Sequence, residues 1–404
     1  MLKHLINKQK TFKQNSTNKE RALLKNLNKE KKAILFLEDG SIFYGWSFGY
    51  LCETSGEVVF NTGMVGYPES LTDPSYHGQI LVQTYPLIGN YGIPSKLTDP
   101  FGIPIHFESE KIQVKGYIVS EFSKNPSHWC FEKTLNQWLI EQKIPGLYGI
   151  DTRELTKKLR VKGVMLGILK TYRNDEKIDI EELKEKIKNV DNPNDRNLVE
   201  DVSTSKPIFY GSENSPLVAV IDCGVKFGIL RCLLNKDLNI VRIPFNYSIN
   251  KILDLNPRGV VISNGPGDPK KCIQTINTLK ELLETDIPVL GICYGVQLLA
   301  LAAGADTFKL KFGHRGQNQP CMDITTKKCY ITSQNHGYAV NLGSLEKTDF
   351  EVYFVNANDK TIEGIKHKKK KIVGIQFHPE ASPGPYETEF LFDRFVKDVK
   401  KCQN

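Results

Sequence analysis

The sequence lacks paired cysteines. None of its nine cysteines forms the C-x-x-C spacing of a zinc or redox site, and an odd number argues against a complete disulfide framework. The closest pairs are Cys321 with Cys329 and Cys223 with Cys232, which are eight and nine residues apart. Scattered free thiols are typical of a protein from a reducing compartment.

An uninterrupted apolar segment that could cross a bilayer is also missing. Residues 287–305 come closest, but Pro288, Gly291 and Gln297 interrupt them, so they predict a buried strand, a turn and a helix. No apolar run follows the basic N-terminus, which argues against a secretory signal peptide. We therefore expect no association with a membrane.

Most of the chain has no net charge. The formal net charge is +8, and residues 1–32 contribute all of this excess through ten Lys or Arg and two Glu. The remainder holds 44 basic and 44 acidic residues, which argues against nucleic-acid binding by the folded part. The basic tail is expected to be disordered or to be an organellar targeting segment. The protein itself is then expected in a plastid stroma or a bacterial-type cytoplasm.

With 404 residues, the chain exceeds the roughly 250–300 at which one core stops growing, so two domains are expected. Residues 33–202 are rich in short strands and turns and predict an N-terminal α+β domain. Residues 203–216 contain Ser, Pro, Gly and Asn without periodicity and predict a linker. In 217–404, apolar strands alternate with helices, which predicts the α/β class with a doubly wound, mostly parallel sheet.

Local patterns predict individual elements in both domains. A hairpin is expected around the turn Glu38-Asp39-Gly40. Helices of the first domain are expected at 131–142, 154–160 and 176–188. In the second domain we expect strands at 217–221, 240–243, 259–262, 288–292 and 371–377, and helices at 228–234, 274–284 and 294–303.

Residues 291–295 (GICYG) lie between an expected buried strand and an expected helix. They match the turn that exposes the nucleophile in many hydrolases, with Cys293 in the nucleophile position. The glycines permit a sharp turn, and the N-terminus of the following helix favours a thiolate. Taken alone, the pattern is equally compatible with a small buried cysteine between two tight-turn glycines.

A cysteine nucleophile needs a base and a group that orients the base. His378 and Glu380 follow the strand expected at 371–377, and side chains two residues apart in an extended segment point the same way. Pro379 favours extended geometry at His378. Alone, this His-Pro-Glu sequence is more typical of a surface loop, but combined with the elbow it predicts a triad with Cys293.

Two further polar segments could complete such a site. Residues 264–269 (NGPGDP) follow an expected strand, and their N–H groups could form an oxyanion hole with the N–H of Tyr294. Gln297 lies one helical turn after Cys293 on the same face. Residues 334–338 (QNHGY) could bind the charged ends of an amino acid, or could form an ordinary turn.

Together these motifs resemble the class I, triad-type glutamine amidotransferases. The first domain narrows the resemblance to the small (glutaminase) chain of carbamoyl-phosphate synthase, over roughly residues 33–400. The matching segments are LEDG (37–40), GEVVFNTGMVGY (56–67), LTDPSY (71–76), GIDTREL (149–155), 263–269, 291–297, KFGH (311–314), 334–338 and HPEASPGP (378–385).

The resemblance implies that the triad Cys293, His378 and Glu380 hydrolyses L-glutamine through a glutamyl thioester. Ammonia would then pass through an internal tunnel to a large chain, which makes carbamoyl phosphate from bicarbonate for arginine and pyrimidine synthesis. The implied glutamine contacts are Ser75, Gly265, Gly267, Tyr294, Gln297, Asn335, Gly337 and Tyr338. No cofactor or metal is expected in this chain, because the resemblance implies ATP and magnesium on the large chain.

The sequence departs from the family at three positions of the expected site. Tyr294, Val296 and Tyr338 stand where Leu, His and Phe are common. A free-standing γ-glutamyl thiol hydrolase is an alternative function that shares the elbow, but it does not account for a first domain without a catalytic pattern. A non-catalytic scaffold for a synthetase is disfavoured, because all three triad positions are occupied.

Overall fold

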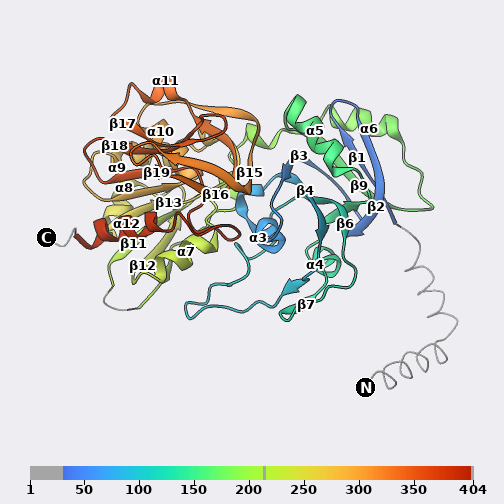
Figure 1. Ribbon diagram of the computed structural model, residues 1–404, viewed down its shortest axis with the longest axis horizontal. Helices are drawn as coiled ribbons and strands as arrows, with labels where there is room; N and C mark the ends of the chain where they lie inside the picture. The colour runs from blue at the N-terminus through green and yellow to red at the C-terminus, as the bar shows by residue number, and fades with distance from the viewer. Residues whose placement is uncertain (1–30, 213–214, 402–404) are drawn as a thin grey trace, which may run out of the picture.

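The computed structural model describes residues 31–212 and 215–401, which form two domains side by side (Figure 1). The predicted tail lies outside these residues except for Lys31 and Lys32, which begin the first strand. Within the described stretches, none of the helices combines the length and the apolarity that a membrane crossing needs.

The N-terminal domain is built around a closed barrel with the strand order β1-β2-β8-β6-β4-β3-β9. Its strands are β1 (Lys31–Leu37), β2 (Ile42–Gly49), β3 (Glu53–Asn61), β4 (Gln79–Ile88), β6 (Gly116–Phe122), β8 (Pro145–Tyr148) and β9 (Met165–Arg173). Its helices are α3 (Tyr67–Thr72), α4 (Leu135–Glu141), α5 (Thr152–Lys162) and α6 (Ile180–Ile187), and β5 (Ile93–Pro94) pairs with β7 (Phe131–Lys133). In β1, Leu35 packs with Leu155 of α5, whereas Phe36 packs with Leu183 of α6. This alternation buries both faces of the strand.

Several predicted elements of this domain are confirmed, and two helices begin later than predicted. The helix expected at 176–188 is α6, which begins at Ile180. The hairpin exists, because β1 and β2 pair antiparallel. The helix expected at 154–160 is α5. The helix expected at 131–142 starts too early: residues 131–133 form β7, and α4 begins after Thr134, whose side chain accepts a hydrogen bond from the N–H of Gln137. This cap sets the start of the helix.

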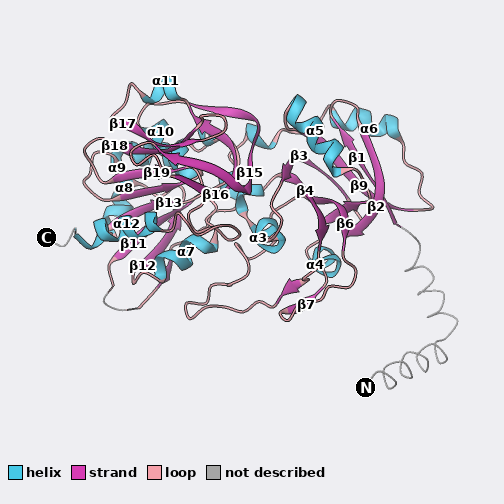
Figure 2. Cartoon of the chain, viewed as in Figure 1, coloured by secondary structure: helices cyan, strands magenta, loops and turns pink. Residues whose placement is uncertain are grey.

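The C-terminal domain contains a ten-stranded sheet with the order β10-β12-β11-β13-β14-β19-β18-β17-β15-β16. Its strands are β10 (Ile208–Tyr210), β11 (Leu217–Asp222), β12 (Asn239–Pro244), β13 (Gly259–Ile262), β14 (Val289–Ile292), β15 (Thr307–Asp323), β16 (Cys329–Val340), β17 (Phe350–Asn356), β18 (Ile362–His367) and β19 (Ile372–Ile375). Its helices are α7 (Phe227–Leu234), α8 (Ile249–Asp254), α9 (Ile273–Leu282), α10 (Tyr294–Ala302), α11 (Leu342–Leu345) and α12 (Phe390–Lys401). Helices α8, α9 and α10 pack on one face of the sheet, and α7 and α12 pack on the other (Figure 2).

The predicted α/β class with a doubly wound sheet is confirmed. Strands β12, β11, β13, β14 and β19 pair in parallel. The sheet then continues through antiparallel strands to β16, so it is mixed. The predicted linker, 203–216, is wrong in part, because β10 within it pairs antiparallel with β12 at the sheet edge.

The hairpin of β15 and β16 brings the sheet to the N-terminal domain (Figure 1). The N–H of Val164 donates to the carbonyl of Lys311 at 2.9 Å, and the N–H of Thr62 donates to the carbonyl of Arg315 at 3.3 Å. The carboxyl ends of the parallel strands therefore open toward a junction between the two domains.

Candidate active site

Cys293 lies on a strained turn between β14 and α10. Its φ is +53° and its ψ is −100°, a conformation that is costly for a residue with a side chain and concentrates at functional sites. Glycines make the turn possible, since a Cβ on Gly295 would lie 2.3 Å from the carbonyl oxygen of Ile262 and a Cβ on Gly291 would lie 2.8 Å from Gly295. The sharp turn predicted at this position is confirmed.

His378 and Glu380 follow β19 at the same edge of the sheet. His378 Nδ1 lies 2.6 Å from Glu380 Oε1, which confirms that the two side chains are neighbours. The carboxylate therefore holds the hydrogen on Nδ1. His378 Nε2 has no hydrogen-bond partner among the described residues, and the Cys293 sulfur is near enough for its charge to raise the pKa of the ring.

Lys226, in the loop after β11, completes this buried group. Its Nζ lies 3.0 Å from Glu380 Oε1 and donates to the carbonyl of Ala381 at 2.8 Å. Burial raises the pKa of Glu380, but the charges of Lys226 and His378 outweigh it and lower that pKa to about 2. Burial lowers the pKa of His378, but the Glu380 charge outweighs it and raises that pKa to about 10. At neutral pH, His378 is therefore an imidazolium paired with a carboxylate.

One cavity at the domain junction brings the expected glutamine contacts together. It is lined by Cys293 and by all eight of them: Ser75, Gly265, Gly267, Tyr294, Gln297, Asn335, Gly337 and Tyr338. Like Ser75, Glu57 and Gln79 of this lining belong to the N-terminal domain. His378 lines a neighbouring cavity instead.

The side-chain amides of Gln297 and Asn335, both in the cavity wall, donate to different partners. Gln297 Nε2 donates to the carbonyl of Tyr338 at 2.9 Å, which leaves its side-chain oxygen for a ligand. Asn335 Nδ2 donates to Asp73 Oδ2 at 2.9 Å, so this side chain joins the two domains. The backbone oxygen of Asn335 lies 3.7 Å from the Cys293 sulfur.

Backbone N–H groups beside Cys293 suit an oxyanion. Tyr294 is the first residue of α10, so its N–H has no acceptor within the helix. Its hydroxyl donates to the carbonyl of Asp268 at 3.3 Å, and the ring thereby supports the loop 264–269. Asn264 anchors the same loop, because its Nδ2 donates to Ser75 Oγ at 2.9 Å.

Three buried charged residues of this region were missed from the sequence: Lys226, Asp73 and Arg315. For Lys226 a signal existed, because it follows β11 at the carboxyl end of a parallel strand, where ligand sites form. Asp73 lies inside the LTDPSY segment, and Arg315 directly follows KFGH. Their roles depend on contacts between distant segments, which no local pattern reports.

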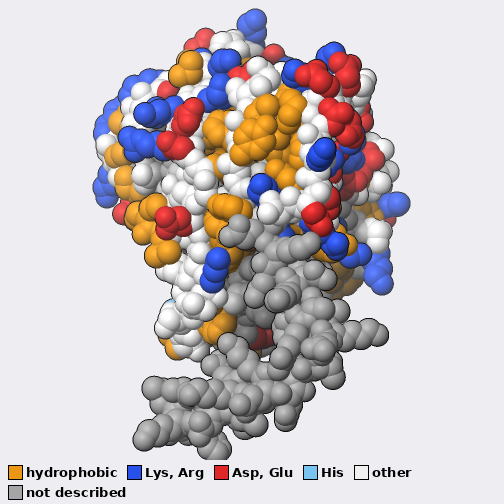
Figure 3. Space-filling model, turned by 90° about the vertical axis from the view of Figure 1, so that its right-hand side faces the viewer, with side chains coloured by type: hydrophobic (Ala, Val, Ile, Leu, Met, Phe, Trp, Pro, Cys, Tyr) orange, Lys and Arg blue, Asp and Glu red, His pale blue; other side chains and the backbone are white. Residues whose placement is uncertain are grey.

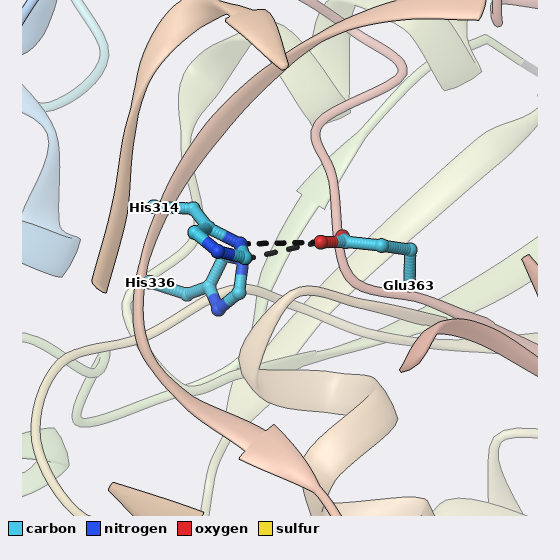
Figure 4. A group of neighbouring side chains, drawn as sticks. All are labelled: His314, His336 and Glu363. Carbon is cyan, nitrogen blue, oxygen red and sulfur yellow. Dashed lines mark hydrogen bonds and ion pairs between the residues drawn. The ribbon is translucent and has the colours of Figure 1, made fainter. Parts of the chain in front are cut away.

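His314 of β15, His336 of β16 and Glu363 of β18 form a buried group (Figure 4). Their donor atoms lie within 4.8 Å of one another, a set that could hold a metal ion. Hydrogen bonds already use these donors: His314 Nδ1 lies 3.2 Å from Glu363 Oε1, and His336 Nδ1 lies 2.8 Å from the carbonyl of Tyr338. Glu363 also accepts from Gln334 Nε2 at 2.9 Å. We interpret the group as an ion-paired support for β16.

The pKa shifts fit that interpretation. Burial lowers the pKa of His314, but Glu363 and Asp359 outweigh it and raise the pKa, which favours an imidazolium between two carboxylates. Burial lowers the pKa of His336, which keeps that ring neutral. Its Nδ1–H then donates to Tyr338 and fixes the strand that carries Asn335 and Gly337.

Comparison with known proteins gives matches over both domains. Residues 35–169 match the family model "Carbamoyl-phosphate synthase small chain, CPSase domain", and residues 219–398 match "Glutamine amidotransferase class-I". The carbamoyl phosphate synthase small chain of Pyrococcus furiosus is 48% identical and covers 91% of this chain and 97% of its own length. That of Methanopyrus kandleri is 46% identical, over 90% of this chain and 98% of its own length. The arginine-specific small chain of Chaetomium globosum is 46% identical, over 91% of this chain and 78% of its own length.

Proposed function

The chain belongs to the carbamoyl-phosphate synthase small-chain family, and from this premise we propose that it is the subunit that hydrolyses L-glutamine to glutamate and ammonia. The observation that carries the proposal is the arrangement around Cys293. A nucleophile on a strained turn interacts with the buried pair of His378 and Glu380 beside a cavity that all eight expected glutamine contacts line.

The first half of the reaction forms a thioester. The Cys293 sulfur attacks the side-chain amide carbon of glutamine, and the carbonyl electrons move to the oxygen. The N–H of Tyr294 and the loop 264–269 stabilise that negative charge. When the carbon–nitrogen bond breaks, protonated His378 supplies the proton with which ammonia leaves. Its raised pKa supports this role as an acid at neutral pH.

Water resolves the thioester in the second half. His378, now neutral, takes a proton from the water as its oxygen attacks, and Cys293 leaves as the thiolate. One water is consumed, and one glutamate and one ammonia are formed. Glu380 stays ionised because of its low pKa, and it keeps the imidazole in the required tautomer.

A second cavity offers ammonia a way out. His378 lines it together with Ser70 and Asp73 of the N-terminal domain and Ser333 of β16. This cavity lies between the domains and shares the lining residue Asn335 with the glutamine cavity, so ammonia released beside His378 would enter it without crossing bulk water. We propose that it passes from there to a large synthetase chain.

The surface of the N-terminal domain suits such a partner. At the end of the molecule formed by this domain, hydrophobic side chains gather between charged ones (Figure 3). Its exposed large hydrophobic residues are Tyr44, Trp46, Tyr50, Met64, Val65, Leu87, Leu97, Ile105, Trp129, Phe131, Ile140 and Val161. Exposed apolar area of this kind favours protein–protein contact, and we propose that residues 33–202 contact the large chain.

The large chain would carry the ATP and magnesium chemistry that makes carbamoyl phosphate from bicarbonate, and this chain would need no cofactor. Relatives include both arginine-specific small chains and the multifunctional protein CAD of Squalus acanthias, which is 48% identical over the matched part. We therefore propose that the carbamoyl phosphate made with this chain's ammonia is used in arginine and pyrimidine synthesis. A plastid stroma or a bacterial-type cytoplasm is the proposed location.

Replacing the nucleophile tests this function. In the complex with the large chain, Cys293→Ser is expected to abolish carbamoyl phosphate synthesis from glutamine and to leave synthesis from added ammonia within about twofold, because the sulfur serves only hydrolysis. Both rates can be measured in one coupled assay. Equal loss of both activities would contradict the assignment. Glutaminase turnover by the isolated chain at the full rate, with no gain from a large chain, would favour the free-standing γ-glutamyl thiol hydrolase.

A further inference from the structure

A cavity of about 310 Å³ lies beside helix α12, and the proposed reaction makes no use of it. We call this space the α12 cavity. Ligand sites of proteins are typically mostly apolar cavities of at least about 300 Å³ with a few polar groups. The α12 cavity has this character, because α12, β14, β17 and β19 give it an apolar wall formed by Val289, Leu290, Tyr353, Val373, Leu391 and Phe395.

The α12 cavity lies at the opposite edge of the sheet from the triad. Val289 and Leu290 are the first residues of β14, whose carboxyl end leads to Cys293. Val373 pairs with Leu290 in parallel and belongs to β19, whose carboxyl end leads to His378. Helix α12 itself lies at the end of the molecule away from the N-terminal domain (Figure 1). A ligand of this cavity would therefore contact neither the triad nor the surface proposed for the large chain.

An oriented guanidinium lies at the mouth of the α12 cavity. Arg394 is exposed and lines the cavity, and its Nη1 donates a hydrogen bond to the hydroxyl of Tyr353. Its guanidinium carbon also lies 4.7 Å from the centre of the Phe390 ring. Over residues 31–212 and 215–401, no carboxylate forms an ion pair with Arg394. The group is thus held in place by two uncharged partners and keeps its charge for an anion.

The other charged groups of the lining do not cancel this charge. Asp323 Oδ1 already accepts two backbone N–H groups of the following turn, at 2.8 and 3.0 Å. The Nζ of Lys366 lies 3.2 Å from Glu351 Oε1 and 5.4 Å from the centre of the Tyr353 ring, so a second cation adjoins the tyrosine that Arg394 contacts. The lining carries a net charge of +1, from Lys366, Lys371 and Arg394 against Asp323 and Asp398.

We propose that the α12 cavity binds a small molecule made of a bicyclic aromatic ring system and one carboxylate. An apolar cavity of about 150 Å³ suffices for benzene, so the α12 cavity has room for two fused rings. The rings of Tyr353 and Phe395 in its wall are suitable aromatic partners for such a body. Arg394 donates to the carboxylate from the N–H groups that Tyr353 leaves free.

A matched pair of molecules tests both parts of this proposal. Indole-3-acetate carries the two rings and the carboxylate, and indole-3-acetamide is a neutral molecule of nearly the same shape. In an NMR titration of the full-length chain, the acetate is expected to bind with a dissociation constant of about 1 mM or lower, which is ordinary for a ligand of this size. The acetamide should bind at least about threefold more weakly. Absence of acetate binding at millimolar concentration, or equal binding of the two molecules, would overturn the proposal.

A variant of the guanidinium identifies the group that selects the anion. Arg394→Gln is expected to weaken binding of the acetate by about three- to tenfold, because it removes a charge-assisted hydrogen bond at an exposed position, and to leave binding of the acetamide within about twofold. Arg160→Gln is the matched control, because Arg160 is also exposed and adjoins a phenylalanine ring, that of Phe312, at 5.8 Å. It should bind both molecules as the unchanged chain does. An unchanged affinity of Arg394→Gln for the acetate would contradict the assigned role.

Two further measurements locate the bound molecule. Val373→Phe adds bulk to the cavity wall and should abolish detectable binding of both molecules, and cooperative thermal unfolding checks that this variant is folded. If it is not, Arg394→Gln still decides the question, because that side chain is exposed. Excess L-glutamine should not displace the acetate, since Cys293 lies at the other edge of the sheet. Displacement by glutamine, or full binding by folded Val373→Phe, would place the molecule elsewhere and overturn the assignment of this cavity.

Discussion

At the scale of single residues, buried charges around His378 fix one another. Glu380 is fully buried as an anion because Lys226 on one side and the His378 imidazolium on the other lie within hydrogen-bond distance. Each partner shifts the pKa of Glu380 against the effect of burial. The triad therefore depends on a fourth residue, which orients the carboxylate and does not line the glutamine cavity.

Lys226→Gln should show this dependence. Because Lys226 lowers the pKa of Glu380, its loss is expected to raise that pKa and move the acid limb of the kcat/KM profile to higher pH. Leaving a buried charge without its partner is also expected to lower the free energy of unfolding by about 3–5 kcal/mol. Urea unfolding and a pH-rate profile would measure both effects.

A matched control separates this effect from loss of any lysine. Lys158 pairs with Asp39 at the surface, so Lys158→Gln should cost at most about 1 kcal/mol and leave the profile in place. An unshifted acid limb in Lys226→Gln would show that the lysine has no influence on the ionisation of Glu380.

Local sequence patterns predicted the triad but not the buried charged residues around it, for a physical reason. Cys293 is marked by flanking glycines, and His378 and Glu380 are marked by their spacing, so local geometry was enough to predict them. Lys226 and Arg315 gain their importance from what lies opposite them after folding. A lysine or arginine in isolation predicts an exposed side chain.

At the scale of elements, ion pairs of His314 with Glu363 and Asp359 support the hairpin of β15 and β16. His314 reaches both Glu363 and Asp359, the latter at 2.8 Å from Nε2. These contacts raise the pKa of His314 above its ordinary 6.5. A raised histidine pKa contributes stability that is fully present below the unfolded pKa and is lost as pH rises through the folded pKa.

Glu363→Gln tests this linkage. The variant is expected to be less stable than the unchanged chain by about 1.5–3 kcal/mol near pH 6, because it loses a hydrogen bond between charged groups. The difference should shrink as pH rises from 6.5 through the raised folded pKa of His314, because the unchanged chain also loses this proton over that interval. Chemical denaturation between pH 5.5 and 9 would measure it. Glu351→Gln, on the exposed side of β17, should show no such trend, and a constant difference for Glu363→Gln would exclude an imidazolium.

The same strand shows why sequence patterns predicted the parallel centre and missed the antiparallel extension. Strands such as β13 are buried on both faces and are therefore continuous apolar runs. In contrast, β15 and β16 contain buried polar residues, among them Gln334, which donates to Glu363, and His336, which donates to the carbonyl of Tyr338. These residues erase the apolar alternation of a strand. The edge strand β10 is three residues long, too short for a pattern, and so its segment resembled a linker.

At the scale of the whole molecule, the two domains build the site together. Asp73 of the N-terminal domain accepts a hydrogen bond from Asn335, and Ser75 accepts one from Asn264. Glu57 pairs with Lys309 across the same junction. The first domain is thus part of the reaction centre as well as a surface for a partner, which explains why a glutaminase fold alone would leave the cavity open on one side.

This shared construction predicts that hydrolysis and synthesis can be separated between the domains. Ser70 of α3 is buried and lines the same cavity as His378, and it does not line the glutamine cavity. Ser70→Leu would fill part of this space, so ammonia would leave by another path. In the complex we expect glutamine hydrolysis to stay within a few-fold while carbamoyl phosphate formed per glutamine consumed falls at least about tenfold. Added ammonia should still support synthesis, since the large chain is untouched.

Ser70→Ala keeps the cavity open, so this control variant should still form one carbamoyl phosphate per glutamine consumed. If Ser70→Leu also kept one product per glutamine, ammonia would have to leave elsewhere, and the inter-domain cavity would not be its path.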